Sequence, residues 1–246
     1  MPFYTNLLKT MITVSLLGVA SYMDIKEREI DDRIWNIMFA VCFPIALYDI
    51  FSKSLYTNKI FIIVYLISII IGIAFALALY KLNMMGGADA KAFIVLSLTE
   101  PPSFRLHDFI PSLSIFINSV LLSLTFMILI ILRNISLVVR GERIFEPYSN
   151  SSIEKAVAFI TLTPVSKEEI KRKPYVYVIA ERREGDKKRI EVGIKALSEI
   201  PDLDISTIDS RLVWVSYLMP MIVYITVGYV AYKLAGCLLL YIIPLY

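Results

Sequence analysis

Six stretches of the chain are dominated by apolar residues, and polar residues gather between them. The stretches are Phe3–Met23, Ile34–Phe51, Ile60–Leu82, Ala90–Leu98, Pro111–Leu132 and Leu212–Ile243. A helix that crosses a bilayer needs about 20 apolar residues, and every stretch except the fourth is long enough. The fourth stops at Pro101-Pro102 and predicts a short or re-entrant helix. The pattern therefore predicts a mainly α, polytopic membrane protein with about six transmembrane helices.

The segment between the last two long stretches has a different pattern, because charges of both signs return and the apolar runs become short. Ser151-Ser152-Ile153-Glu154 and Ser166-Lys167-Glu168-Glu169 are typical helix starts. Tyr175–Ala180 and Arg189–Ile194 are strand-like, with a turn predicted at Glu184-Gly185-Asp186. We expect a membrane domain over residues 1–138, a small cytoplasmic α+β insertion over 139–211, and a last transmembrane helix over 212–246.

Cationic residues near the ends of the apolar stretches predict the orientation. The loops after the first, third and fifth stretches are the richer set, with Lys26, Arg28, Arg33, Lys81, Lys91, Arg133, Arg140 and Arg143; the alternate loops hold Lys53, Lys59 and Arg105. Cytoplasmic loops carry the excess of Lys and Arg, so the N-terminus is expected outside. Because Lys9 lies inside the first stretch instead of before it, we expect a retained helix and not a cleaved signal peptide.

Composition supports a membrane protein and excludes several other classes. Hydrophobic residues make up 57% of the 246 residues, above the roughly 45–50% of soluble domains. A formal net charge of +3 gives no case for a nucleic-acid partner. Cys42 and Cys237 are the only cysteines and His107 is the only histidine. These residues provide neither a zinc cluster nor a disulfide framework, so we expect no metal and no cofactor.

Two aspartates lie at the ends of apolar stretches on the predicted cytoplasmic side. Asp24 follows the first stretch, and Asp89 follows Gly86-Gly87-Ala88 and opens the fourth. An ionisable group at such a place is a functional candidate, and two carboxylates together can activate water. The alternatives are a helix-capping role for Asp89 and a solvated carboxylate at Asp24 that Lys26 or Arg28 compensates. Asp49 and Asp108 belong to the opposite side and are not expected to reach the pair.

The two segments around these aspartates resemble the active-site motifs of the type IV prepilin peptidase and preflagellin peptidase family. Asp24-Ile25-Lys26-Glu27-Arg28 resembles the first motif, with its catalytic aspartate before a basic, Ile-containing stretch. Gly86-Gly87-Ala88-Asp89-Ala90-Lys91 resembles the Gly-x-Gly-Asp-x-Lys motif, with Ala88 in place of a glycine. The resemblance covers roughly residues 3–132.

This resemblance implies an aspartic endopeptidase that removes leader peptides from preflagellin or pilin-like precursors at the cytoplasmic face. Asp24 and Asp89 would be catalytic, with Gly86, Gly87, Ala88, Lys91, Lys26 and Arg28 as support. The chain lacks the paired Cys-x-x-Cys motifs of many bacterial members. The resemblance therefore favours the archaeal preflagellin branch, without methyltransferase activity.

Two other classes of function compete with a protease. An ion- or proton-coupled transporter also uses intramembrane acids and broken helices. Its acids usually lie at the midplane between repeated halves, whereas this chain has acids at helix ends and no internal repeat. In a non-catalytic scaffold, the soluble insertion would carry the function, and both aspartate motifs would then be coincidental.

Overall fold

The computed structural model describes residues 2–56, 59–102, 110–146, 148–184, 187–192 and 211–242. They form two compact units. The helical unit comprises Met1–Ser123 and Pro220–Tyr246, and the mixed unit comprises Leu124–Met219. His107, Asp108 and the predicted turn residues Gly185 and Asp186 lie outside the described residues.

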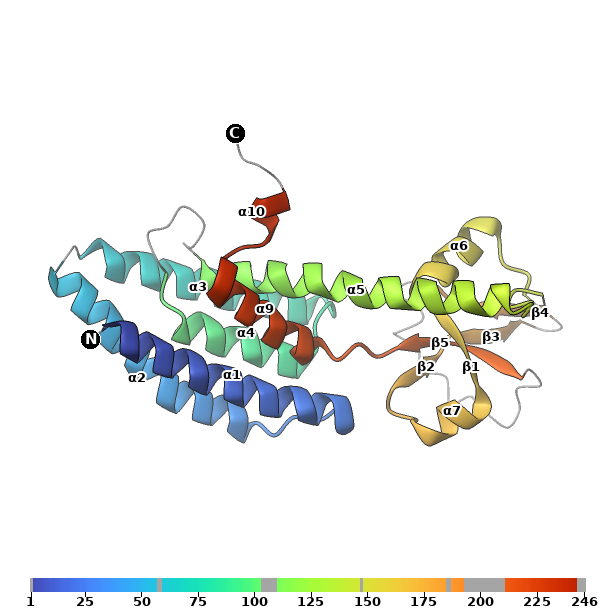
Figure 1. The fold of residues 1–246 in the computed structure, drawn as a ribbon, viewed down its shortest axis with the longest axis horizontal. Coiled ribbons are helices and arrows are strands. Elements are labelled where there is room, and N and C mark those ends of the chain that lie inside the picture. The colour runs from blue at the N-terminus through green and yellow to red at the C-terminus, as the bar shows by residue number, and fades with distance from the viewer. Residues whose placement is uncertain are drawn as a thin grey trace. The chain divides into compact units, whose positions relative to one another are not determined.

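In the helical unit, the short helix α4 (Gly87–Thr99) packs against several other helices (Figure 1). The helices of this unit are α1 (Pro2–Lys26), α2 (Arg33–Tyr56), α3 (Ile60–Lys81), α4, the first half of α5 (Pro111–Val139), α9 (Met221–Ala235) and α10 (Leu239–Ile242). Helix α4 contacts α2, α3 and α9, while α1 contacts α2 and α9. Leu17, Met38, Phe93 and Ile225 are among the buried side chains that these helices share.

Helix α3 illustrates why this unit suits a bilayer. Its buried positions are Tyr65, Ser68, Gly72 and Ala76, which are mostly small. Large apolar side chains such as Ile63 and Ile70 are exposed instead. Small residues between helices and large apolar residues facing outward are typical of transmembrane packing, since lipid replaces water as the surrounding solvent.

Glycines let two pairs of helices approach closely. A Cβ built at Gly72 would lie 2.3 Å from the Ser97 Oγ of α4. A Cβ at Gly228 of α9 would lie 2.8 Å from the backbone nitrogen of Ser119 in α5. Both distances are shorter than a Cβ at the glycine position would permit, so Gly72 leaves room for the Ser97 side chain and Gly228 lets α9 approach the backbone of α5.

The mixed unit contains two antiparallel sheets and two short helices. It comprises the end of α5 followed by α6 (Ser152–Thr161), β1 (Thr163–Ser166), α7 (Lys167–Arg172), β2 (Tyr177–Ile179), β3 (Glu181–Glu184), β4 (Lys187–Ile190) and β5 (Leu212–Tyr217). One sheet has the order β1-β5-β2, and β3 pairs with β4 in the other. Register is fixed by pairs such as Pro164 with Trp214 and Val178 with Ser216.

Both helix starts predicted in this region are confirmed. The Ser151 Oγ accepts a hydrogen bond from the Glu154 N–H, and the Glu154 carboxylate accepts one from the Ser151 N–H, which makes a complete capping box. Ser166 caps α7 in the same way through the Glu169 N–H. Side-chain oxygens here satisfy backbone donors that have no partner within the helix.

The last apolar stretch was wrongly predicted as one transmembrane helix. Residues Leu212–Tyr217 form strand β5, α9 begins at Met221 after Pro220, and α10 follows. Val213, Trp214 and Val215 are β-branched or aromatic, as is typical of strands. In a continuous apolar run, however, hydrophobicity alone does not distinguish a buried strand from a helix. Within the described residues, four helices are long and apolar enough to cross a membrane: Tyr4–Lys26, Arg33–Ser52, Ile60–Lys81 and Pro111–Val139.

This strand also changes the expected domain limits. Because β5 pairs with β1 and β2, its residues belong to the mixed unit and not to a final membrane segment. The end of α5 belongs there too, since the Asn134 side chain donates to the Leu162 carbonyl and accepts from the Thr163 hydroxyl. The mixed unit therefore begins at Leu124 and ends at Met219.

Candidate active site

Asp24 lies in the last turn of α1, and only 14% of its side chain is exposed. Its Oδ2 accepts a hydrogen bond from the Ile222 backbone N–H at 3.3 Å, in the first turn of α9. A carboxylate is unfavourable at a helix C-terminus but favourable at an N-terminus, where unpaired N–H groups point outward. The N-terminus of α9 therefore offsets the electrostatic cost of placing the Asp24 carboxylate at the C-terminus of α1.

Arg28 is the cation nearest this carboxylate. Its Nη1 lies 3.9 Å from the Asp24 Oδ1, a distance that allows a charge interaction without a direct hydrogen bond. Arg28 has a left-handed backbone (φ 59°), which turns the chain away after α1. Lys26 is exposed, pairs with Glu27 at 3.3 Å and lies over the Tyr22 ring. Of the two candidate cations, Arg28 is therefore the one beside Asp24.

Asp89 lies in the first turn of α4 and folds back over the residue that precedes the helix. Its Oδ2 accepts a hydrogen bond from the Gly86 N–H at 3.2 Å. Gly86 has an extended backbone (φ −68°, ψ 158°) that other residues adopt readily. A Cβ at Gly86 would lie 3.0 Å from the Asp89 Oδ2, whereas one at Gly87 would lie 3.7 Å from the Tyr80 ring. A glycine at position 86 therefore leaves space for the Asp89 carboxylate. Its backbone conformation would not by itself require a glycine.

The two carboxylates share one electrostatic environment. Asp89 lies outside the four candidate spans. Its burial, followed by the negative charge of Asp24, raises the pKa of Asp89 to about 7, against an opposing hydrogen bond from Gly86. This carboxyl therefore keeps its proton to a higher pH than a solvated aspartate does. One protonated and one ionised carboxyl are the two partners that aspartic water activation uses.

Lys91 connects the segments that carry the two aspartates. Its Nζ lies 2.6 and 2.8 Å from the two carboxylate oxygens of Asp32. Asp32 precedes α2 in the loop that follows Asp24, and Lys91 follows Asp89 in α4. Ala88, the departure from the family motif, is half-buried in the first turn of α4. The motif lysine thus ties the start of α4 to the loop after α1.

Breaking this exposed ion pair is expected to have a modest effect. Lys91→Met and Asp32→Asn should each lower kcat/KM for precursor cleavage by up to about fivefold, because exposed pairs are worth roughly 0.2–1 kcal/mol. The double variant should be no worse than either single variant, since both remove the same contact. Steady-state kinetics on all four proteins measures the coupling. Strictly additive losses would show that the two residues act separately.

No candidate metal site accompanies the aspartates. Among the residues that the structure describes, no three His, Cys, Asp or Glu side chains come together in a way that could hold a metal ion. Cys42 and Cys237 are both buried and unpaired with each other.

Sequence reasoning missed two contributors to this site. The Ile222 N–H belongs to a residue 198 positions after Asp24, and the start of its helix lies within one long apolar stretch whose hydrophobicity alone marks no boundary. Pro220, just before that helix, is the signal that could have placed it, because proline is common at helix starts. Asp32 lies in an acidic loop with Glu27, Glu29 and Asp31, and nothing in the sequence distinguishes it from them. Its pairing with Lys91 depends on the approach of α4 to α2, which spacing alone does not give.

The four candidate spans indicate a multi-pass membrane protein, and its two partly buried aspartates lie at the end of α1 and the start of α4, within one compact unit. The sequence profile of the type IV leader peptidase family matches residues 11–134, just over half of the chain. The chain therefore belongs to the type IV leader peptidase family, and it is a membrane peptidase of that kind. No match was found among curated proteins. The matched segment contains both aspartates, Gly86, Gly87 and Lys91, and the predicted family is confirmed.

Proposed function

We propose that this peptidase is an aspartic endopeptidase and that it removes the leader peptide of preflagellin-like or other pilin-like precursors at the cytoplasmic face of the membrane. Asp24 and Asp89 are its catalytic pair. The observation that carries this proposal is that the family profile matches residues 11–134 and so includes both aspartates, which lie at the end of α1 and the start of α4 in one compact unit. Burial, followed by the charge of Asp24, raises the pKa of Asp89 to about 7, which is consistent with such a pair. Membership of a peptidase family supports hydrolysis over ion transport.

The surroundings of each carboxyl suggest its role. Asp24 accepts the Ile222 N–H and has the Arg28 guanidinium nearby, and both stabilise an anion. Asp24 is thus suited to take a proton from the attacking water. The neighbouring charge of Asp24 favours the protonated form of Asp89, so Asp89 is suited to donate a hydrogen bond to the oxygen of the scissile carbonyl.

The proton balance of the reaction follows from these roles. Water adds to the carbonyl carbon as its proton passes to Asp24, and the proton of Asp89 moves to the carbonyl oxygen. The tetrahedral intermediate then breaks at the C–N bond, and the amine leaves with the proton held by Asp24. One of the two hydroxyl protons returns to Asp89 and the other stays on the new carboxyl group, which restores the starting state of the pair.

The orientation supports access from the cytoplasm. Lys26 and Arg28 follow Asp24, and Lys81 and Lys91 flank the glycines before and after Asp89. Cations concentrate on the cytoplasmic side of membrane proteins, and this charge pattern supports a cytoplasmic position for both aspartates. A precursor whose apolar helix lies in the bilayer presents its leader junction at the same interface.

The rate of cleavage should fall as the pH rises above about 7. The folded-state pKa of Asp89 is raised to about 7, so the carboxyl holds its proton below that pH and loses it above. Above this range both carboxylates are ionised, and the scissile carbonyl loses its proton donor. We expect kcat to decline roughly tenfold per pH unit on the alkaline limb. A rate that stays constant to pH 9 in stable enzyme would contradict this role for Asp89.

The proposal is tested with purified protein in detergent and a pilin-like precursor, with a chelator present throughout. Mass spectrometry of the products should show one cut at the junction between the leader and the apolar helix. Glu27→Gln serves as a control because Glu27 is an exposed acid three residues from Asp24, and it should cleave within about twofold of wild type. If the purified chain cuts neither preflagellin-like nor other pilin-like precursors, the proposed function is wrong.

A further inference from the structure

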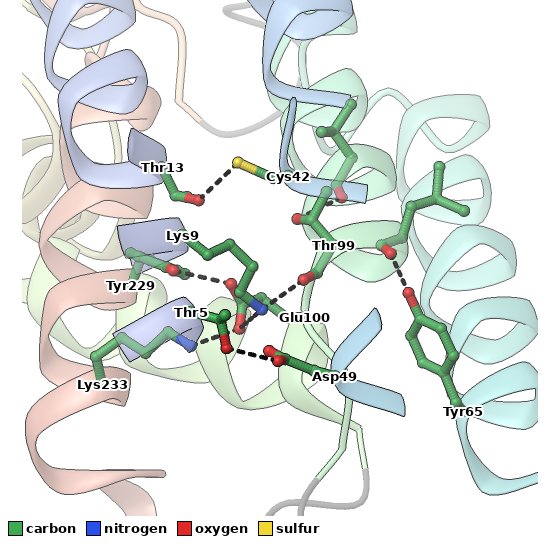
Figure 2. Close-up of polar contacts among 12 residues, drawn as sticks. Thr5, Lys9, Thr13, Cys42, Asp49, Tyr65, Thr99, Glu100, Tyr229 and Lys233 are labelled. Carbon is green, nitrogen blue, oxygen red and sulfur yellow. Dashed lines mark hydrogen bonds and ion pairs between the residues drawn. The ribbon is translucent and has the colours of Figure 1, made fainter. Parts of the chain in front are cut away.

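A group of buried charges surrounds the end of α4 that lies opposite Asp89 (Figure 2). Glu100 follows the last residue of α4 and is 2% exposed, and Lys9 of α1 is 1% exposed. The Glu100 Oε2 lies 3.2 Å from the Lys9 Nζ and 2.5 Å from the Lys233 Nζ of α9. The Tyr229 hydroxyl donates to the other carboxylate oxygen at 2.8 Å. One carboxylate therefore joins α4 to both α1 and α9.

The same end of α4 is held a second time through its backbone. The Lys9 Nζ donates to the Thr99 carbonyl at 2.7 Å, and the Tyr65 hydroxyl of α3 donates to the Leu98 carbonyl. The last carbonyls of a helix have no partners within it, so donors from other helices satisfy them. Figure 2 shows Lys9 reaching both Thr99 and Glu100 from α1. Lys9 is thus bound to the backbone and to the side-chain anion at the end of α4.

A fourth charge completes the group. Asp49 of α2 is 4% exposed and accepts a hydrogen bond from the Thr5 hydroxyl of α1 at 2.8 Å. With Lys9, Lys233 and Glu100, it gives two charges of each sign. Sequence analysis placed Asp49 away from the catalytic pair, and the structure puts it in this buried group (Figure 2).

Stability alone does not explain these charges. Burying an ion pair removes both groups from water, and apolar residues of similar size often stabilise a fold equally well. Charged groups within a membrane bundle are costly for the same reason. The ion pairs instead fix the relative position of the helices, because an ammonium and a carboxylate group interact strongly only over a narrow range of distances and angles. The group therefore fixes where the end of α4 lies along α1 and α9.

The helices held here also carry the proposed catalytic pair. Lys9 and Asp24 are both on α1, about 22 Å apart along its axis, and Glu100 and Asp89 are separated by about 16 Å along α4 at a rise of 1.5 Å per residue. Helices are stiff over such lengths. An axial shift of α4 at Glu100 therefore moves Asp89 by the same amount relative to Asp24.

We propose that Lys9 and Glu100 are positioning residues, which set the axial position of α4 on α1 and hence the approach of Asp89 to Asp24. The catalytic part of this inference rests on the proposed function, whereas the positional part does not. A displacement of about 1 Å can lower a rate by roughly 10²-fold, so a small shift at the far end suffices to impair the pair.

Two matched variants separate positioning from stability. Lys9→Met and Lys233→Met each leave Glu100 with one lysine and with Tyr229, but only Lys9→Met also removes the bond to the Thr99 carbonyl. We expect Lys9→Met to lower kcat about tenfold with KM unchanged within twofold, and Lys233→Met to lower kcat less than threefold. Tyr65→Phe, which frees only the Leu98 carbonyl, should lower kcat about threefold and provides a second test if Lys9→Met fails to fold.

Spin labels supply a readout that does not depend on catalysis. Cysteines at Ile25 of α1 and Ala88 of α4, with Cys42 and Cys237 replaced by serine, report the distance between the two segments in nanodiscs. Lys9→Met should shift or broaden this distance by about 1.5 Å or more, one residue of helical rise, and Lys233→Met should not. Equal effects of the two variants, or an unchanged distance and kcat in folded Lys9→Met, would overturn the proposal. A shifted distance in a protein that cleaves no precursor would support the positioning while refuting the proposed function.

Discussion

Asp24→Asn and Asp89→Asn should each reduce precursor cleavage by about 10³-fold or more, because each removes one partner of the water-activating pair. Asparagine keeps the shape of the side chain but neither accepts nor donates a proton in the reaction. The double variant should be no slower than either single variant, since the two carboxyls act as a unit. Single-turnover assays of purified variants in detergent measure the remaining rate.

Folding must be monitored in parallel, since Asp24 also accepts the Ile222 N–H. The asparagine Oδ1 can still accept this hydrogen bond, so thermal unfolding midpoints should stay within a few degrees of wild type. Retention of more than a tenth of the wild-type rate in either folded variant would exclude the pair as the catalytic centre.

Gly86→Ala is expected to reduce kcat by about tenfold or more, while Gly87→Ala leaves it within about twofold. The methyl group at position 86 would lie 3.0 Å from the Asp89 Oδ2, so the carboxylate must move by a few tenths of an ångström. Small displacements of a catalytic group are costly because the reacting atoms must be aligned. KM should change little in either variant, since neither glycine is proposed to bind the leader.

Gly87→Ala is a close control. Its methyl group would lie at an ordinary contact distance of 3.7 Å from the Tyr80 ring, and alanine is the better helix former at the first position of α4. If both variants lost activity equally, flexibility of the Gly86-Gly87 segment would explain the motif better than space for Asp89.

The pattern of apolar residues predicted most of the helical unit. The stretches Phe3–Met23 and Ile60–Leu82 correspond to α1 (Pro2–Lys26) and α3 (Ile60–Lys81). Long apolar runs allow few alternatives in lipid, because helices satisfy every backbone hydrogen bond internally. The pattern failed at Leu212–Ile243, where pairing of β5 with β1 and β2 decided the structure. Strand pairing depends on partners far along the chain, which local hydrophobicity does not reveal.

The candidate site was predictable only in part for the same reason. Asp24, Asp89 and the glycines were found because a charged group beside an apolar run stands out locally. The partners Ile222 and Asp32 are backbone or ordinary loop groups whose importance comes from tertiary contact. The buried group around Glu100 was also missed, because Lys9 and Glu100 are 91 positions apart and neither belongs to a recognisable motif.

The contact between Asp24 and the start of α9 has a consequence for the timing of biosynthesis. Ribosomes make the chain from its N-terminus, so Asp24 and Asp89 emerge long before Ile222, whose N–H donates to the Asp24 carboxylate. Until α9 has been inserted, the carboxylate at the end of α1 lacks its backbone donor. A nascent chain that already contains every residue matched by the family profile is thus incomplete at the proposed active centre, and competence to cleave is expected only after residue 222 has been made and α9 has inserted.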